Sequence, residues 1–313
     1  MEKKLSCILL YAFLITITFP MLNSEAKAKQ PLSLATDQTA LLSLKHTSLL
    51  LATNWTNSTS VCTWIGVTCS FRHHRVAALN LSNMALSATI PPQLRHLSFL
   101  VSLDLTNNLF HGDLPQELSL LRRLKFISFR LNNFTGDIPP MLGQLPKLEY
   151  LNLRNNSFIG SIPKSLSNLT NLQFLDLRSN SLSGEIPKEL GRLQSLQTLY
   201  VQRNHLSGAI PSAIFNISTL VAMGFTYNEL SGSLPTDMCR NLPFLGGIYL
   251  SFNQLSGAIP TNLSHCSRLE VLSLSYNSFS TGEIPSEIGY LTSLQFLALG
   301  GNNLNGMVQV LIT

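Results

Sequence analysis

The sequence has little charge and no long apolar run outside its amino terminus. Only 12% of its 313 residues are charged, 21 of them basic and 16 acidic. No internal stretch reaches the ~18–20 apolar residues that a membrane-spanning helix needs. The small positive excess is too diffuse to indicate a nucleic-acid partner. The abundant leucines are regularly spaced, which indicates a repeat protein rather than a membrane protein.

The amino terminus is typical of a secretory signal. Lys3 and Lys4 form a short basic segment, residues 5–19 are apolar, and an Ala-x-Ala site spans residues 26–28. An uncleaved membrane anchor is the alternative, but the apolar run is short for a span. We predict a signal peptide over residues 1–28 and passage through the secretory pathway.

Cysteine usage agrees with an oxidising compartment. Removal of the signal takes Cys7 away and leaves four cysteines, which suggests two disulfides among Cys62, Cys69, Cys239 and Cys266. Three pairings are open, and we favour the local ones, Cys62–Cys69 and Cys239–Cys266. A zinc site is disfavoured, because the two histidines that follow Cys69 lack a second Cys-x-x-Cys pair.

An internal repeat of 24 or 25 residues fills most of the chain. A fixed asparagine marks each copy, at Asn108, Asn132, Asn156, Asn180, Asn204, Asn228, Asn253, Asn277 and Asn302. A degenerate first copy precedes them and has Met84 in place of the asparagine. Chance cannot produce such a register. The repeat predicts a solenoid of stacked coils, because no single coil can bury its apolar face alone.

Each position of the repeat has a physical role. Leu151 and Leu153 alternate with outward residues and predict a short strand. Asn156 turns the chain, and its amide can bond the backbone of its own and the neighbouring coil. Gly160 permits the tight bend that follows, and residues 166–169 predict a short helical or 3-10 turn. The predicted fold class is an α/β repeat: a leucine-rich-repeat solenoid with a parallel β-sheet on its concave face and short helical or 3-10 turns on its convex face.

The segment before the repeats predicts a cap with a disulfide. We expect Thr36 or Asp37 to cap an apolar-periodic helix that reaches Leu50, followed by the Cys62–Cys69 segment. Such a unit covers the open apolar end of the first coil. We predict the amino-terminal cap over residues 29–75 and about ten repeats over residues 76–313.

At these residues the chain resembles the ectodomains of plant leucine-rich-repeat receptor-like kinases, in particular the branch with immune receptors for bacterial patterns. The resemblance rests on the Asp37 helix, the Cys-x-Trp-x-Gly-Val-x-Cys cap and the Leu-Ser-Gly-x-Ile-Pro repeats, and it covers essentially the whole mature chain. It implies a glycosylated ectodomain, in the apoplast or on the outer face of the plasma membrane, that senses peptides or proteins in plant defence. It also implies a membrane co-receptor as partner and a second strand, associated with the Gly-x-Ile-Pro segment, that twists the solenoid.

The chain departs from that family near its end. Gln309 stands where the repeat has proline, and no carboxy-terminal cysteine pair, spanning helix or kinase domain follows. The kinase motifs Gly-x-Gly-x-x-Gly, His-Arg-Asp and Asp-Phe-Gly do not occur. We expect a truncation before the transmembrane and kinase regions and no carboxy-terminal cap. A short secreted decoy and a chain closed by a partner are the alternatives.

No catalytic constellation emerges from the sequence. The histidines fall mostly in convex or loop positions without matched carboxylates. Asp104 and Asp176 share a strand column, but three repeats separate them by roughly 14 Å, too far for glycosidase chemistry. We therefore expect a protein that is not an enzyme and that uses no cofactor or metal.

Outward residues of repeats three to five predict a ligand site. Arg130, Arg154 and Arg178 occupy one position in consecutive repeats, about 5 Å apart, where like charges repel and the repeat requires no arginine. An aromatic column runs beside them, and aromatic residues with arginine are typical of binding hot spots. The candidate ligand-binding residues are Phe126, Arg130, Tyr150, Arg154, Phe174, Asp176, Arg178 and Tyr200.

We hypothesise that this site binds an extended ligand with a carboxylate or another acidic group. The alternative is a solvated face, partly neutralised by Asp104 and Asp176. A glycan on Asn155 would crowd the site. Its sequon is one of eight, at Asn54, Asn57, Asn80, Asn133, Asn155, Asn168, Asn216 and Asn262.

Two functions are compatible with these predictions. The first is receptor-type sensing, in which the solenoid binds a peptide or protein and passes the event to a membrane partner or to a missing kinase. The second is a secreted inhibitor of a cell-wall-degrading enzyme, similar to the polygalacturonase-inhibiting proteins. Those inhibitors are expected to close with carboxy-terminal cysteines, which this chain lacks.

Overall fold

The computed structural model describes residues 33–44, 49–280 and 284–305. The predicted signal peptide at residues 1–28 and the end of the chain after residue 305 lie outside these ranges. Within the described ranges, no helix combines the length and the apolar character needed to cross a bilayer.

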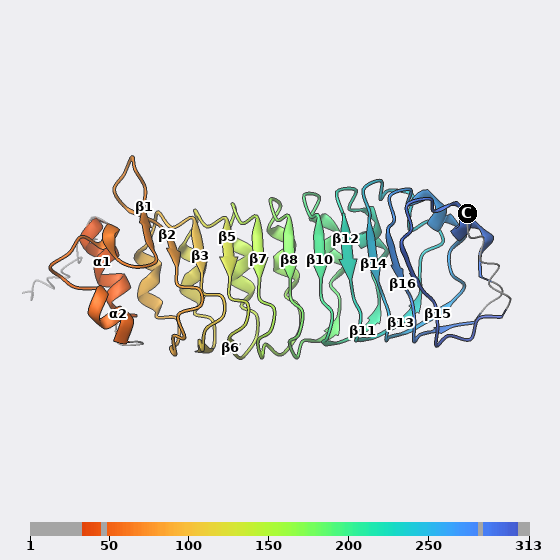
Figure 1. The fold of residues 1–313 in the computed structure, drawn as a ribbon, viewed down its shortest axis with the longest axis horizontal. Helices are drawn as coiled ribbons and strands as arrows, with labels where there is room; N and C mark the ends of the chain where they lie inside the picture. Colours follow the sequence, from red (N-terminus) through yellow and green to blue (C-terminus); the bar gives the residue numbers. More distant parts are fainter. Residues whose placement is uncertain (1–32, 45–48, 281–283, 306–313) are drawn as a thin grey trace, which may run out of the picture. The chain divides into compact units, whose positions relative to one another are not determined.

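One sheet of 11 strands runs along the stacked coils (Figure 1). Its first two strands pair antiparallel and all the others pair parallel. In spatial order the strands are β1 (Val67–Cys69), β2 (Val76–Asn80), β3 (Ser102–Asp104), β5 (Phe126–Ser128), β7 (Tyr150–Asn152), β8 (Phe174–Asp176), β10 (Thr198–Tyr200), β12 (Ala222–Gly224), β14 (Gly247–Tyr249), β16 (Val271–Ser273) and β18 (Phe296–Ala298). We call the outward side of this sheet the sheet face.

A second row of strands follows the sharp bend after seven of the main strands in the described residues. Five of them form a parallel sheet: β9 (Ser183–Glu185), β11 (His205–Ala209), β13 (Glu229–Ser233), β15 (Gln254–Gly257) and β17 (Ser278–Phe279). A separate pair contains β4 (His111–Gly112) and β6 (Asn133–Phe134). Gly208 in β11 has φ of +73°, a left-handed conformation that glycine adopts without steric cost. The second strand that the family resemblance implied is therefore present.

Short 3-10 turns return the chain on the side opposite the sheet. The turns within the repeats are η3 (Pro92–His96), η4 (Gln116–Leu120), η5 (Pro140–Gln144), η6 (Lys164–Asn168), η7 (Lys188–Arg192), η8 (Ser212–Asn216), η9 (Thr261–His265) and η10 (Ser286–Tyr290). Each follows a proline, such as Pro187 before η7, because proline has the backbone angle of a turn entry but cannot continue a strand ladder. The predicted sheet and 3-10 turns are confirmed.

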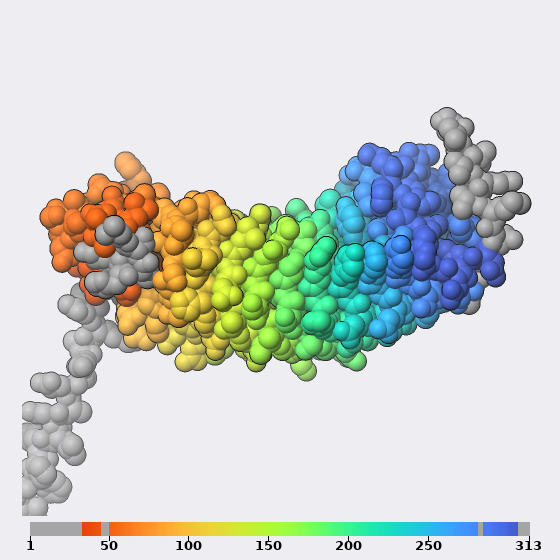
Figure 2. Space-filling view, turned by 60° about the horizontal axis from the view of Figure 1, so that its bottom comes forward, coloured from red at the N-terminus to blue at the C-terminus, as the bar shows by residue number. Residues whose placement is uncertain are grey.

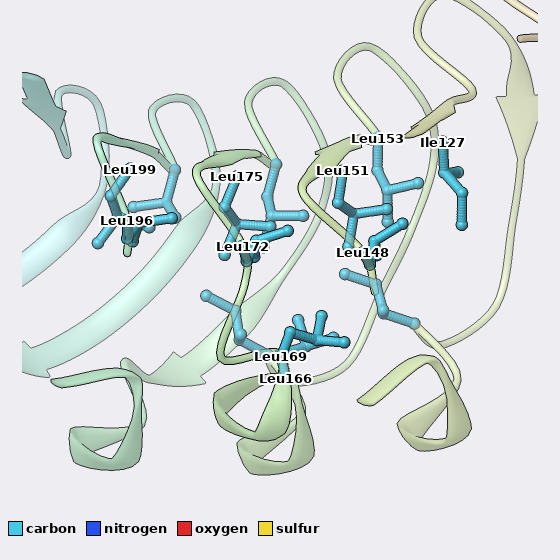
Figure 3. Packing of buried hydrophobic residues seen from close by; sticks show 14 of the residues in the cluster. Ile127, Leu148, Leu151, Leu153, Leu166, Leu169, Leu172, Leu175, Leu196 and Leu199 are labelled. Carbon is cyan, nitrogen blue, oxygen red and sulfur yellow. The ribbon is translucent and has the colours of Figure 1, made fainter. Parts of the chain in front are cut away.

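The core lies between the sheet and the turns as columns of leucine (Figure 3). Leu151, Leu175 and Leu199 stand opposite one another on neighbouring strands and are fully buried. A column from a turn closes the other side of each coil, with Leu166 as an example. Because each coil buries its leucines only against the next, the coils follow one another in sequence order along the stack (Figure 2).

The repeated asparagines form the predicted ladder. Asn180 donates its amide hydrogens to the carbonyls of Leu153 and Leu177, each at 3.0 Å. Its Oδ1 accepts the backbone N–H of Phe158 at 3.1 Å. The side chain thus bonds its own coil and the preceding one, and it satisfies backbone groups at a partly buried bend.

The amino-terminal cap begins differently from our expectation. The first helix is α1 (Leu34–Leu42), and α2 (Leu49–Asn54) follows as a separate helix. Ser33 is the N-cap, and the Thr36 hydroxyl accepts the Ser33 N–H at 2.8 Å. The predicted N-cap at Thr36 or Asp37 was therefore wrong, because Thr36 completes a capping box from inside the helix and Asp37 is buried. The cap also contains the short turn η2 (Val61–Thr63).

Both predicted disulfides are present. Cys62 and Cys69 join across seven residues in the cap, with a Cα–Cα distance of 5.4 Å. Cys239 and Cys266 join neighbouring repeats across 27 residues, with a Cα–Cα distance of 5.2 Å. The second bridge therefore crosslinks two coils on the side of the 3-10 turns.

We expect the longer bridge to stabilise the chain more than the shorter one. Loop-closure entropy predicts a loss of about 3.5 kcal/mol for the variant Cys239→Ser/Cys266→Ser and about 2.4 kcal/mol for Cys62→Ser/Cys69→Ser. Urea unfolding followed by circular dichroism measures both losses. Equal losses, or a larger loss in the cap, would contradict the entropic explanation.

A candidate recognition surface on the sheet face

An aromatic column lies on the sheet face at β5, β7 and β8. Phe126, Tyr150 and Phe174 stand opposite one another in the strand register. Their rings stack with centroids 4.5 Å and 4.4 Å apart and are nearly parallel. Tyr200 on β10 ends the column edge-on, with its centroid 6.4 Å from that of Phe174. A stacked column presents ring edges rather than ring faces to a ligand.

Arg178 is held by its own strand. Its Nε and Nη2 donate to the two carboxylate oxygens of Asp176 at 2.9 Å and 2.6 Å. The guanidinium carbon lies 4.3 Å from the centre of the Tyr200 ring. Asp176 is only 1% exposed, so this pair fixes the arginine and neutralises its charge. Arg178 therefore shapes the surface but offers little net charge to a ligand.

Arg130 and Arg154 carry the available positive charge. Arg154 Nε donates to Oδ1 of Asn155 at 3.0 Å, and Arg130 is exposed. Partial burial lowers the pKa of Arg154 below its ordinary value, and the charges of Arg178 and Arg130 lower it further, against the opposing effect of Asp176. Across the described residues neither Arg130 nor Arg154 forms an ion pair. An anionic ligand would relieve this repulsion between like charges.

Tyr200 and Asp104 lie at the margins of the site. Burial raises the pKa of the Tyr200 phenol above its ordinary 10.0, with a further contribution from Tyr249, although Arg178 opposes the shift. Asp104 on β3 accepts the Thr106 N–H at 2.9 Å and lies in the same column as Asp176, with β5 and β7 between them. Asp176, rather than Asp104, is therefore the carboxylate that neutralises an arginine.

Sequence reasoning missed a fourth arginine, Arg203. Its charge also lowers the pKa of Arg154, and its guanidinium carbon lies 5.0 Å from the centre of the Tyr227 ring. Arg203 precedes the ladder residue Asn204, at the corner where the strand ends, and it has a left-handed φ of +57°. The signal was available, because the residue before each ladder asparagine can be read off the repeat. The outward strand positions alone do not include it.

An open hollow of about 730 Å³ lies beside the arginines at the ends of the strands. Its lining is rich in asparagine and includes Asn107, Leu131, Asn155 and Ser179. These four residues occupy the corner position that Arg203 occupies in the next repeat. Within the described chain, no three histidine, cysteine, aspartate or glutamate side chains come together in a way that could hold a metal ion.

The asparagines of the sequons differ in solvent exposure. Asn54, Asn57, Asn80, Asn133, Asn168 and Asn216 are exposed, and Asn155 and Asn262 are half-buried. Asn80 belongs to β2 of the main sheet, so this sequon lies on the sheet rather than on a turn or loop. Asn155 is hydrogen-bonded to Arg154. Occupancy of the sequons stays a prediction.

Three family profiles match the chain. The leucine rich repeat N-terminal domain matches residues 34–70, the leucine rich repeat matches residues 122–182, and the leucine-rich repeat region matches residues 160–281. The LRR receptor-like serine/threonine-protein kinase EFR of Arabidopsis thaliana is 40% identical over 70 residues, which are 21% of this chain and 7% of EFR. Another receptor-like protein kinase of that plant is 34% identical over 102 residues, 31% of this chain and 10% of the kinase. The matches thus span a tenth or less of these relatives' length.

Solved structures show the same architecture over most of the chain. The ectodomain of the Arabidopsis thaliana membrane receptor kinase GASSHO1/SCHENGEN3, in complex with CASPARIAN STRIP INTEGRITY FACTOR 2, has a TM-score of 0.82 and 36% identity over 86% of this chain and 33% of its own. The Arabidopsis receptor kinase HAESA, in complex with the peptide hormone IDA and the co-receptor SERK1, has a TM-score of 0.69 and 31% identity over 85% of this chain and 50% of its own. A plant ice-binding protein has a TM-score of 0.68 and 27% identity over 89% of this chain and 99% of its own.

The parallel strands, the asparagine ladder and the disulfide-linked cap define a leucine-rich-repeat solenoid. The chain belongs to the leucine-rich-repeat proteins. Within them it is similar to the ectodomains of plant receptor-like kinases.

Proposed function

We propose that this chain is the extracellular recognition part of a plant receptor-like protein. In this proposal it binds an extended peptide or protein segment with an acidic group on its sheet face, and it is not itself an enzyme. The observation that carries the proposal is the pair Arg130 and Arg154, free of ion pairs within the described residues and next to a stacked aromatic column.

The chemistry of the surface selects the ligand class. Two uncompensated guanidinium groups favour a carboxylate, which accepts several charge-assisted hydrogen bonds in a plane. The ring edges of the aromatic column carry partial positive charge and suit carbonyl oxygens of a peptide backbone. An extended peptide that crosses the strands can meet both features at once.

Similar proteins support the same assignment. The ectodomains of GASSHO1/SCHENGEN3 and HAESA were solved in complex with a factor or a peptide hormone, and the HAESA complex includes a co-receptor. We propose by analogy a peptide ligand, a membrane co-receptor and a location in the apoplast or at the outer face of the plasma membrane. This similarity favours the receptor interpretation over the secreted enzyme inhibitor.

A peptide library displayed on phage tests the ligand class. We expect selection of random 12-residue peptides on the purified chain to enrich peptides with aspartate, glutamate or a terminal carboxylate. Arg154→Ala should weaken binding of a selected synthetic peptide about ten- to hundredfold, since a hydrogen bond to a charged group contributes about 1.5–3 kcal/mol. Isothermal titration calorimetry measures the change.

Arg192→Ala is the matched control, because Arg192 is an exposed arginine on the 3-10 turn η7, on the opposite side of the coil. This variant should bind as the wild type does. Selected peptides without acidic groups, or an unchanged affinity in both Arg130→Ala and Arg154→Ala, would refute the proposal.

A further inference from the structure

We propose that a second aromatic stack, formed by Tyr227, Phe252 and Tyr276, binds an uncharged apolar segment of the same extended peptide. The inference rests on the proposed function, since it assigns the acidic group of that peptide to Arg130 and Arg154. It adds a second binding site for the ligand and a fixed spacing between the two parts of the ligand.

The second stack is large and exposed. Its ring centroids are 4.2 Å and 4.4 Å apart, with interplanar angles of 8° and 15°. Tyr227, Phe252 and Tyr276 are 44%, 36% and 58% exposed. Because the rings cover one another's faces, only their edges meet the ligand, which disfavours a sugar that would stack on a ring face and suits the side chains and carbonyls of a peptide.

The backbone at the stack does not favour aromatic residues. Tyr227, Phe252 and Tyr276 have φ of +57°, +58° and +55°, in the left-handed region that bulky side chains rarely occupy. The same corner position holds asparagine, which tolerates this conformation, in earlier repeats such as those of Asn107 and Asn155. Aromatic residues in three consecutive repeats therefore oppose the local backbone preference, and such strain concentrates at functional sites.

The stack continues the row of corner residues from Arg203, next to the arginines of the proposed site. Arg203 lies at the same corner one repeat earlier, with its guanidinium carbon 5.0 Å from the centre of the Tyr227 ring. Beside the stack, the outward positions of the last four strands carry no charged residue. They are Ala222, Gly224, Thr226, Gly247, Tyr249, Ser251, Val271, Ser273, Ser275, Phe296, Ala298 and Gly300. The outward strand positions thus change from cationic to neutral and aromatic, which matches a peptide with an acidic segment followed by an apolar one.

The strand order sets the spacing within the ligand. Four strand spacings separate β7, which precedes Arg154, from β14, which precedes Phe252. At ~4.8 Å per spacing this is about 19 Å, which about six extended residues span. We therefore expect an apolar or aromatic residue about six positions from the acidic group.

The peptides selected on phage test this inference. We expect their alignment to show the acidic residue and, about six positions away, an aromatic or aliphatic residue. The double variant Tyr227→Asn/Phe252→Asn should bind a selected synthetic peptide at least tenfold more weakly than the wild type. Its melting temperature should be unchanged or higher, because asparagine suits the left-handed corner and neither change creates a glycosylation sequon.

Two controls separate binding from folding. Tyr290→Gln removes an aromatic side chain that is 72% exposed on the 3-10 turn η10, and it should leave affinity unchanged. A peptide whose apolar residue is replaced by serine should bind the wild type and the double variant equally weakly, because the contact is already lost.

The outcomes distinguish the inference from the proposed function. If Arg154→Ala weakens binding and the double variant does not, the second stack is not part of the site and the inference is wrong, while the proposed function stands. A double variant with a sharply lower melting temperature would make the stack structural and also overturn the inference. Selected peptides without an acidic group would overturn the proposed function and, with it, the spacing predicted here.

Discussion

Replacing Asn204 by alanine is expected to lower the free energy of unfolding by roughly 2–6 kcal/mol. The buried Leu182 N–H is left without a partner, which costs about 1–3 kcal/mol, and two further hydrogen bonds of about 0.5–1.5 kcal/mol each are lost. The Asn204 amide donates to the carbonyls of Leu177 and Val201 at 3.0 Å and 2.9 Å. Its Oδ1 accepts the N–H of Leu182 at 3.0 Å. Alanine would orphan the Leu182 N–H, whereas the carbonyls of Leu177 and Val201 would each keep one bond, from the amides of Asn180 and Asn228. Urea denaturation followed by far-ultraviolet circular dichroism measures the loss.

Asn171→Ala is the control for this prediction. Asn171 is exposed and donates to the carbonyl of Pro146 at 2.8 Å, where water can replace it. We expect a change within about 0.5 kcal/mol for this surface site. Comparable losses in the two variants would mean that the asparagine ladder does not stabilise the stack through its buried hydrogen bonds.

The second large effect is expected at Asp37 in the cap. Its carboxylate accepts the Nε and Nη2 of Arg75 at 2.7 Å and 2.6 Å, and also the N–H of Val76 at 3.0 Å. Asp37 is fully buried and Arg75 is 7% exposed. Asp37→Ala removes the anionic partner of a buried cation and should therefore destabilise the chain by about 3–5 kcal/mol.

The exposed pair of Lys125 and Glu149 is the control, since its Nζ–Oε1 distance is also 2.6 Å. Water solvates both of those side chains, so Glu149→Ala should cost about 0–1 kcal/mol. Chemical denaturation of both variants checks the difference. If both substitutions cost equally little, burial does not set the strength of the cap ion pair.

The ion pair of Asp37 and Arg75 could not be predicted from the sequence. Apolar spacing predicts the cap helix, and it suggests Thr36 or Asp37 as the N-cap because threonine and aspartate are common there. Arg75 is 38 residues away in the chain, and nothing in the repeat periodicity relates the two. Only the packing of α1 against the first coil brings the carboxylate and the guanidinium together.

The candidate site was also predicted only in part, because some of its contacts depend on packing that the sequence does not reveal. The repeat register placed Phe126, Tyr150 and Phe174 in one column, because a parallel in-register sheet keeps equivalent residues adjacent. It did not reveal that Arg178 folds back onto Asp176, since that depends on side-chain conformation and burial. The hypothesis treats three arginines as equivalent. In the structure Arg130 and Arg154 are available to a ligand, whereas Arg178 is neutralised by Asp176.

By itself the sequence determined the coil and the order of the coils, because a repeat of 24 or 25 residues allows each apolar column to be buried only against its neighbours. The tertiary structure decided which charges are neutralised, which corner residues adopt a left-handed backbone, and that Tyr227, Phe252 and Tyr276 stack on the surface. Periodicity encodes which residues are equivalent, whereas burial, rotamer and charge pairing depend on atoms from several coils at once. The fold therefore follows from the repeat, and the chemistry of the sheet face follows from its packing.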